Sequence, residues 1–387
     1  MPVVGIVAEF DPLHLGHAHL IGALRERLGR ETPVVAAMSG SFTQRGEAAI
    51  CTAAARAEMA LEAGADLVLE LPAACSVASA EAFARYGVEA LQKTGVVDTL
   101  GFGSESGDVF SLRRWAAGLN SPAFGPILRE ESAKGISFAH ARTQALERLT
   151  GGKPPAGAND LLAMEYLRFW PGEAVAVQRR DGGHGGGQSA SEVRRRLSAG
   201  DWSGAMKLLP RESAAILERE AASGRCPASL VHAERAMLYR LRTMTASDFA
   251  ALPDCTEGLE HRLVAAAGEA DTLEDFYARA KSKRYAHARI RRIALRAFLG
   301  ITALPEQVDY LRVLGASEVG LALLHEMRTR AAVPIITKPA HGKALPEPAR
   351  ARFALDRRCD DLWGLCLERP IPAGWSWRQT PVLRQKK

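Results

Sequence analysis

Short apolar, β-branched runs alternate with longer helical stretches over the first 110 residues, and this alternation limits the possible folds more than any other feature. The apolar runs lie at residues 3–9, 34–38, 67–71 and 96–102, and the helical stretches at 17–28, 52–63 and 80–93. Strands separated by helices of about 10–15 residues form βαβ units with a parallel sheet. We therefore predict an α/β fold with a Rossmann-like sheet. Its ligand should lie beyond the carboxyl ends of the strands.

The second half of the chain has a different pattern. After a possible strand at 175–178 and the glycine-rich stretch 181–188, strand signals largely vanish. Helical spacing then dominates at 192–199, 211–223, 228–244, 259–267, 273–280 and 288–298. We predict an α/β domain over residues 1–200 and a mainly helical domain over residues 201–387.

Composition limits the class of protein. The six cysteines are scattered without any C-x-x-C pair, so we expect reduced, isolated thiols in place of a zinc ribbon or a disulfide framework. The chain has neither an apolar run of the ~18 residues that span a bilayer nor a basic, apolar leader, and we expect a cytoplasmic protein. Its net charge of +6 permits a nucleic-acid partner without requiring one.

The most informative motif is His14-Leu15-Gly16-His17, which lies where the first predicted strand ends and the first predicted helix begins. Free N–H groups and the positive end of a helix face whatever binds there. Gly16 allows a close approach of the backbone, and both imidazoles can donate hydrogen bonds to phosphate oxygens. The placement predicts a nucleotide site.

A second phosphate-binding pattern follows at residues 189–194, where Ser189 and Ser191 precede Arg194. Hydroxyls and an arginine at a helix start can clamp a phosphate, although a plain helix N-cap would also explain the serines. In this order the two patterns resemble the HIGH and [ST]-x-[ST]-x-x-R signatures of the nucleotidyltransferase and class I aminoacyl-tRNA synthetase superfamily. We assign His14, His17 and Arg194 as the catalytic residues.

More of the chain resembles the tRNA(Met) cytidine acetate ligase family. The matching segments, in the family's order, are 4–10, 14–17, 38–47 (MSGSFTQRGE), 66–72 (DLVLELP), 102–105, 159–162, 178–180, 189–194, 257–260 and 281–285. Position 11 is Asp11 where the family commonly has Asn, and Leu15, Ala158 and Ser191 also depart from its usual residues. Asp11 would add negative charge near a triphosphate unless it faces a magnesium ion or an arginine.

The resemblance implies that ATP and acetate form acetyl-adenylate, whose acetyl group passes to the wobble cytidine of elongator tRNA(Met). It implies ATP contacts, with Mg²⁺ on the phosphates, from Val7, Ala8, Glu9, Phe10, Asp11, Pro12, Leu13, His14, Leu15, Gly16, His17, Ala18, His19, Leu20, Gly103, Asn159, Arg179, Arg180, Ser189 and Ser191. Acetate is ionised at neutral pH, so the first step requires positioning and charge neutralisation but no general base. Gln44 and Arg45 follow the second strand and should lie at the rim of the same site, although Arg45 and Gly46 could equally serve as a structural turn.

A basic segment in the helical part is the candidate tRNA contact. It carries Lys281, Lys283, Arg284, Arg289, Arg291, Arg292 and Arg296 without an acidic residue. Positive charges interleaved with Tyr285 and His287 suit an RNA backbone. The alternative is a solvated helix whose charges pair with neighbouring carboxylates. For Trp375 and Trp377 we expect a packing role.

Two other functions fit parts of this pattern. A small-molecule adenylyltransferase of cofactor biosynthesis would use the same phosphate-binding motifs, but this function would give the basic helical part no role. A catalytically silent RNA-binding protein would keep the fold, and the intact His14, Gly16, His17 and Arg194 argue against it.

Overall fold

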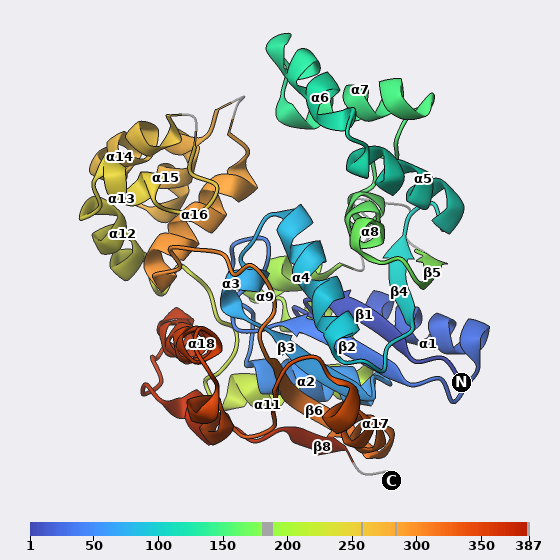
Figure 1. Cartoon of the computed structure of the whole chain (residues 1–387). Helices are drawn as coiled ribbons and strands as arrows, with labels where there is room; N and C mark the ends of the chain where they lie inside the picture. Colours follow the sequence, from blue (N-terminus) through green and yellow to red (C-terminus); the bar gives the residue numbers. More distant parts are fainter. Residues whose placement is uncertain (180–188, 257, 283–284, 385–387) are drawn as a thin grey trace.

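The computed structural model describes residues 1–179, 189–256, 258–282 and 285–384. Its centre is an eight-stranded, mostly parallel sheet with helices on both faces (Figure 1). The strands are β1 (Val4–Ala8), β2 (Val34–Ser39), β3 (Leu67–Leu71), β4 (Thr99–Ser104), β5 (Glu173–Gln178), β6 (Leu311–Ser317), β7 (Ile335–Ile336) and β8 (Val382–Arg384). They lie in the order β5-β4-β1-β2-β3-β6-β7, with β8 beside β6. The predicted α/β class is confirmed.

Strands β1 to β5 are parallel, and the chain order reverses between β1 and β4. From β1 the chain moves outward through β2 and β3 and then returns to β4 on the other side of β1. Such a reversal opens a crevice at the carboxyl ends of the two strands. The fold therefore places the H-x-G-H segment, which follows β1, at the point where ligands bind in sheets of this kind.

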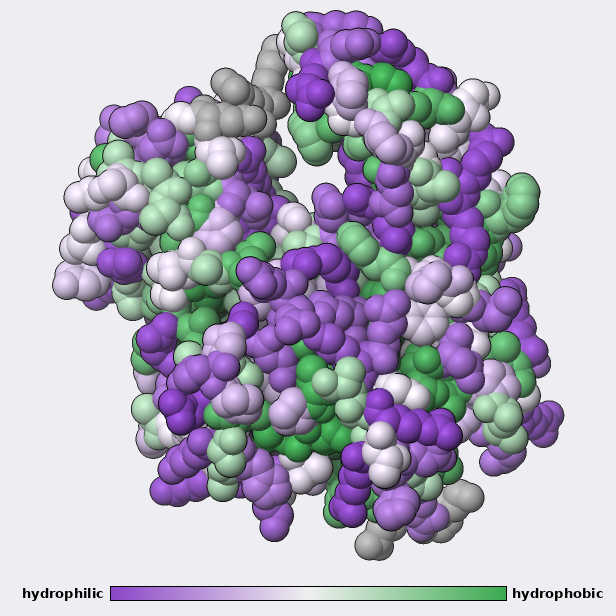
Figure 2. Space-filling view, in the orientation of Figure 1, coloured by the Kyte–Doolittle hydropathy of each residue, from purple (hydrophilic) through white to green (hydrophobic). Residues whose placement is uncertain are grey.

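The helices, in chain order, are α1 (Leu15–Leu28), α2 (Ala53–Glu62), α3 (Ala73–Ser76), α4 (Ala80–Lys93), α5 (Val109–Asn120), α6 (Phe124–Ala133), α7 (Phe138–Thr150), α8 (Ala158–Phe169), α9 (Ala190–Ser198), α10 (Trp202–Met206), α11 (Arg211–Ala222), α12 (Glu234–Arg242), α13 (Ala246–Ala250), α14 (Leu259–Glu269), α15 (Leu273–Ala280), α16 (His287–Leu299), α17 (Glu318–Arg330) and α18 (Ala349–Trp363). Helices α12 to α16 form one group and α5 to α7 another, on opposite sides of the view (Figure 1). Figure 2 shows a hollow between these two groups, with hydrophilic residues along its borders.

Successive side chains of a strand point to opposite faces of the sheet, so each strand contributes to a hydrophobic core on either face. Every residue of β2 is buried. Val34, Ala36 and Met38 pack with α1, α2 and α11, whereas Val35 and Ala37 pack with α4, α5 and α8 on the opposite face. A strand that is covered on both faces has a continuous apolar sequence, and this is the pattern that made the first strands recognisable. Helices α12 to α16 pack around a third core, which also includes residues of α3 and α18 and Phe42 from the loop after β2.

The expectation that strands largely vanish after residue 188 is wrong for β6. This strand pairs antiparallel with β3, at Leu67↔Ala316 and Glu70↔Arg312, so the end of the chain completes the sheet of the first half. Arg312 interrupts its apolar run and hides the strand signal in the sequence. The helix expected over 228–244 is also shorter: α12 covers Glu234–Arg242, and residues 230–233 form turns before it.

The cysteines are unpaired and the two tryptophans near residue 376 pack on other aromatic rings, as expected. All six cysteines are free and buried. Trp375 packs on Trp363 with ring centroids 5.6 Å apart, and Trp377 packs on Phe353 at 5.8 Å. Among the described residues, none of the helices combines the length and hydropathy that a bilayer crossing requires.

A buried ionic cluster joins the end of the chain to its first half. The Glu70 carboxylate of β3 pairs with Arg312 of β6 at 2.5 Å and with Arg357 of α18 at 3.1 Å. Asp360 pairs with Arg357 at 2.6 Å and accepts a hydrogen bond from Ser41. All of these side chains are buried, so each charge depends on its partner because water cannot replace it.

Replacing Glu70 with alanine should destabilise the protein by about 3–5 kcal/mol, because it leaves two arginines buried with one carboxylate fewer. Urea unfolding at neutral pH measures this loss. The control is Glu326→Gln, which removes the exposed 3.5 Å pair with Arg330 and should cost at most about 1 kcal/mol. Equal losses in the two variants would contradict the role given to the buried cluster.

Candidate active site

His14 and His17 build the first turn of α1 with their own side chains. His14 is the N-cap residue, and its Nδ1 accepts a hydrogen bond from the Gly16 N–H at 3.0 Å. The Nδ1 of His17 accepts one from the His14 N–H at 3.3 Å. The two rings lie 3.9 Å apart, and Phe10 packs edge-on against His17 at 5.1 Å. The motif therefore fixes both rings as part of the helix start.

These hydrogen bonds also fix the tautomer. An imidazole nitrogen that accepts carries no proton, so the remaining proton of each neutral ring lies on Nε2. Burial, together with the positive charge of Arg179, lowers the pKa of His14 to about 4. Burial, with contributions from His14 and Arg179, also lowers the pKa of His17 well below its ordinary range. At neutral pH both rings are uncharged and can donate an Nε2–H to a ligand.

The lowered pKa of His14 predicts a specific loss of stability in acid. Since His14 is neutral when folded but titrates near 6.5 when unfolded, its contribution is complete above pH 6.5 and is lost as the pH falls toward 4. At pH 5 this amounts to about 1–2 kcal/mol relative to pH 7.5. His14→Asn keeps the capping acceptor and removes the titration. Urea unfolding at both pH values should show the smaller loss for the variant, and equal losses would refute the prediction.

The other wall of the crevice is formed where β4 and β5 end. The backbone N–H of Arg179 donates to the Ser104 carbonyl at 2.9 Å, next to Gly103. A Cβ at Gly103 would lie 3.8 Å from the Arg179 side chain. Asn159, in the first turn of α8, donates its side-chain N–H to Glu105 at 2.7 Å. Although burial opposes ionisation of Glu105, hydrogen bonds from Asn159 and the Asp160 N–H outweigh it and lower the pKa. The loops after β4 and β5 thus meet, and Arg179 lies near enough to His14 and His17 for its charge to lower their pKa values.

Arg194 reaches this site from α9 and is held by two carboxylates. Its guanidinium pairs with Asp11 at 2.5 Å and with Glu47 at 2.6 Å. Asp11 also accepts from the Ile50 N–H at 2.6 Å and is 2% exposed. The charge of Asp11 therefore faces an arginine, one of the two arrangements under which it can be tolerated near a triphosphate.

The remaining predicted residues divide by exposure. Phe10, Pro12 and Leu13 are buried with Asp11 beneath the loop, whereas Leu15 is exposed and Val7, Ala8, Glu9, Gly16, Ala18, His19 and Leu20 are partly exposed. Ser189 caps α9 by accepting from the Glu192 N–H at 3.2 Å, and Ser191 accepts from Arg45 at 2.9 Å. The backbone of Gln44 donates to Glu9 at 2.6 Å, so residues 44 and 45 do lie at the predicted rim. Arg180 lies outside the described residues.

The basic segment is only partly at the surface. Lys281 is exposed, and Lys283 and Arg284 lie outside the described residues. Arg289 is half-buried and donates to the Asp254 carbonyl and to Thr256. Arg292 is 8% exposed, so little of its side chain is available to the RNA phosphate that the sequence predicted it to contact. Arg296 is fully buried and donates to the Val77 and Pro253 carbonyls.

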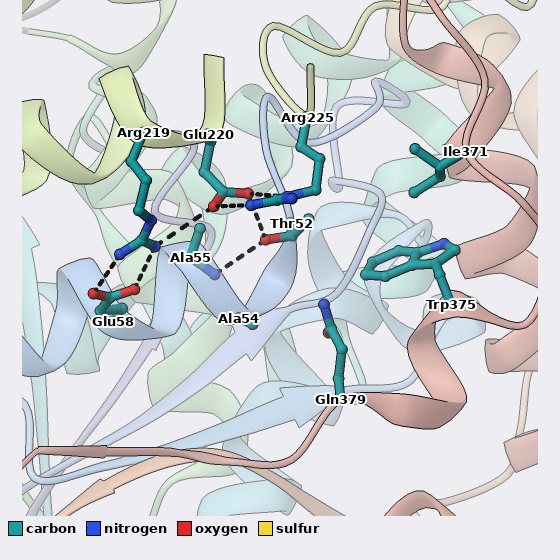
Figure 3. Close-up of a pocket in the computed structure, with 10 residues that line it drawn as sticks. All are labelled: Thr52, Ala54, Ala55, Glu58, Arg219, Glu220, Arg225, Ile371, Trp375 and Gln379. Carbon is teal, nitrogen blue, oxygen red and sulfur yellow. Dashed lines mark hydrogen bonds and ion pairs between the residues drawn. The ribbon is translucent and has the colours of Figure 1, made fainter. Parts of the chain in front are cut away.

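A cavity of about 430 Å³ lies away from the nucleotide loops, between α2, α11 and the end of the chain (Figure 3). Its charges already neutralise one another: Arg219 pairs with Glu58 at 2.6 Å and Arg225 with Glu220 at 2.9 Å. The β1–β4 crevice, where both His14 and His17 leave an Nε2–H free to donate at the start of α1, is therefore the better candidate for an anion. Among the described residues, no group of three or more His, Cys, Asp or Glu side chains is arranged to hold a metal ion.

Comparison with known proteins finds relatives that match nearly the whole chain. The family model for HIGH Nucleotidyl Transferase matches residues 1–373. The tRNA(Met) cytidine acetate ligase of Syntrophomonas wolfei is 33% identical and covers 99% of each chain, and that of Caldanaerobacter subterraneus is 35% identical over 94% of this chain and 95% of its own. Thermotoga maritima TmcAL superposes with a TM-score of 0.93 in its apo form and 0.92 with bound alpha-thio ATP, at 29% and 30% identity, with both chains fully covered.

Proposed function

The chain belongs to the HIGH nucleotidyl transferase family and, within it, to the tRNA(Met) cytidine acetate ligases, and on that premise we propose that it acetylates tRNA in two ATP-dependent steps. The observation that carries the proposal is the pair of neutral histidines beside Arg179 at the β1–β4 switch point. Two Nε2–H donors and a helix N-terminus suit the phosphates of ATP.

In the first step a carboxylate oxygen of acetate attacks the α-phosphorus of ATP. The bond between that phosphorus and the bridging oxygen breaks, and pyrophosphate leaves with the electron pair. His14 and His17 donate hydrogen bonds to the phosphate oxygens, while Arg179 and Arg194 neutralise the charge that develops. We propose that Mg²⁺ accompanies the pyrophosphate group. No residue of the chain needs to accept a proton in this step.

In the second step the N4 amine of the wobble cytidine attacks the carbonyl carbon of acetyl-adenylate. The carbon–oxygen bond to AMP breaks, AMP leaves with the electron pair, and the amine loses a proton to solvent. The products are N4-acetylcytidine and AMP. Since the acceptor is a tRNA, we propose that the reaction takes place in the cytoplasm.

We assign the two tasks to the two parts of the chain. For ATP we propose contacts from residues 7–20, Gly103, Asn159, Arg179 and Arg180, with Ser189 and Ser191 at the start of α9. For elongator tRNA(Met) we propose a contribution from residues 201–387, in particular from Lys281, Lys283 and Arg284 at the start of the basic segment. The hydrophilic hollow beside α12 to α16 offers a surface for an RNA backbone (Figure 2).

The direct test supplies the purified protein with ATP, acetate and elongator tRNA(Met) and analyses the tRNA nucleosides. N4-acetylcytidine that depends on both ATP and acetate supports the proposal. Adenylate formation without acetylated tRNA would retain the first step and refute the acceptor. The absence of both products would favour a catalytically silent RNA-binding protein.

Replacing Lys281, Lys283 and Arg284 together with alanine should weaken tRNA binding. The slope of log affinity against log salt should fall by about one for each RNA phosphate that the variant no longer neutralises. Filter binding between 50 and 200 mM salt measures the slope. The control replaces Arg328 and Arg330 of α17, which removes two positive charges at a place away from α16 and should leave the slope unchanged (Figure 1). An unchanged slope in the triple variant would contradict the RNA role of the segment.

A further inference from the structure

A tight hairpin over residues 42–48 lies between the nucleotide site and α16. Phe42 and Ala48 form an antiparallel bridge. The Thr43 N–H donates to the Glu47 carbonyl at 3.0 Å, and the Gly46 N–H donates to the Thr43 carbonyl at 3.0 Å. These bonds hold the hairpin closed, so its side chains project from one rigid unit.

The hairpin contacts the nucleotide site at three points. The Gln44 N–H donates to the Glu9 carboxylate, which follows β1, at 2.6 Å. Arg45 donates to the Ser191 hydroxyl on α9 at 2.9 Å. The Oε2 atom of Glu47 pairs with Arg194, also on α9, at 2.6 Å.

The same hairpin contacts the helical part. Phe42 is fully buried in the core that α12 to α16 share. Gly46 has a φ of +76°, and a Cβ there would lie 3.1 Å from the backbone of Arg291 and Arg292. A side chain at this position would therefore push the hairpin away from α16. The Oε1 atom of Glu47 pairs with Arg291 at 3.0 Å.

The Glu47 carboxylate thus pairs with two arginines to which we assign different functions. Arg194 belongs to the phosphate clamp, and Arg291 belongs to the basic segment that we assign to RNA. Both are partly exposed, with side-chain fractions of 19% and 24%, so both can be reached by an anionic ligand. A guanidinium has five N–H donors, and Asp11 and Glu47 occupy two of those on Arg194.

We propose that Glu47 is a positioning residue that makes ATP and tRNA bind antagonistically and so orders the two half-reactions. The inference rests on the proposed function. When the triphosphate engages Arg194, Glu47 pairs more strongly with Arg291 and makes that arginine less available to an RNA phosphate. After pyrophosphate has left, Arg194 returns to Glu47 and Arg291 is released for RNA. Because coupling between two sites is reciprocal, bound tRNA weakens ATP binding by the same factor.

The test measures the dissociation constant of ATP, without acetate so that no adenylate forms, in the absence and presence of saturating tRNA(Met). We expect tRNA to weaken ATP binding by about 5-fold in the wild-type protein. In Glu47→Gln and in Arg291→Gln the effect should fall below about 2-fold, the remainder being general repulsion that salt screens. The matched control is Glu192→Gln. Glu192 is likewise held by two arginines, Arg195 and Arg196, but does not contact Arg194, and its loss should leave the 5-fold effect unchanged.

Three results would overturn the inference: no antagonism in the wild-type protein, full antagonism in Glu47→Gln, or equal loss in Glu192→Gln. Thermal unfolding of each variant separates a change in coupling from a loss of folded protein. Wild-type N4-acetylcytidine formation is measured alongside. If the proposed function fails, the wild-type protein forms no product. If only the inference fails, product forms and the antagonism does not depend on Glu47.

Discussion

Replacing Arg194 with alanine is expected to lower the rate of acetate-dependent ATP–pyrophosphate exchange by about 10³-fold. The guanidinium is partly exposed between Asp11 and Glu47, with donors left for the α-phosphate and the leaving pyrophosphate. Without it, charge that builds up on these oxygens has one fewer fixed partner, and the neighbouring carboxylates repel the nucleotide. Exchange of labelled pyrophosphate into ATP, at saturating ATP and acetate, measures the loss.

Two further variants make the Arg194 result specific. Arg194→Lys keeps the positive charge, but an ammonium group cannot reach both carboxylates and the phosphate at once. Its exchange rate should therefore stay at least about 10-fold below that of the wild-type protein. Arg195→Ala removes the next residue of the same helix, whose side chain is 66% exposed and pairs with Glu192, and it should retain full exchange activity. Comparable losses in the Arg194 and Arg195 variants would contradict a phosphate role for Arg194.

Replacing His17 with alanine should reduce the same exchange reaction by about 10²–10³-fold while leaving tRNA affinity unchanged. The substitution removes one Nε2–H donor and the Nδ1 acceptor of the His14 N–H. Because RNA binding is assigned to the other part of the chain, only the first half-reaction should be lost.

The control for the His17 variant is Glu26→Ala, at an exposed position on the same helix. It should keep both exchange activity and tRNA binding. Thermal unfolding of both variants shows whether α1 remains folded. Loss of exchange and of tRNA binding in equal measure would count against the assignment of His17 to the nucleotide site.

Local patterns made the first strands and the phosphate signatures predictable. The apolar runs that became β1 to β4 are largely buried in the sheet, and hydrophobic periodicity reports this kind of burial directly. His14, Gly16 and His17 were recognisable because their task depends on one helix start, which is a property of neighbouring residues. The same holds for Ser189 and Arg194, which lie close together at the start of α9.

Contacts between distant residues could not be predicted in this way. Glu47 meets Arg194 and Arg291 only because three separate loops and helices fold together, and no spacing rule connects residues so far apart. The burial of Arg292 was missed because a run of positive charges does not indicate which residues face inward. Strand β6 was missed because Arg312 looks out of place in a buried strand until Glu70 is seen opposite it.

The most direct test of the central claim, that the β1–β4 crevice activates a carboxylate as an adenylate, is ATP–pyrophosphate exchange by the wild-type protein with and without acetate. The account predicts exchange that requires acetate, proceeds without tRNA and disappears in the Arg194→Ala variant. Exchange that ignores acetate, or that persists undiminished without Arg194, would contradict it.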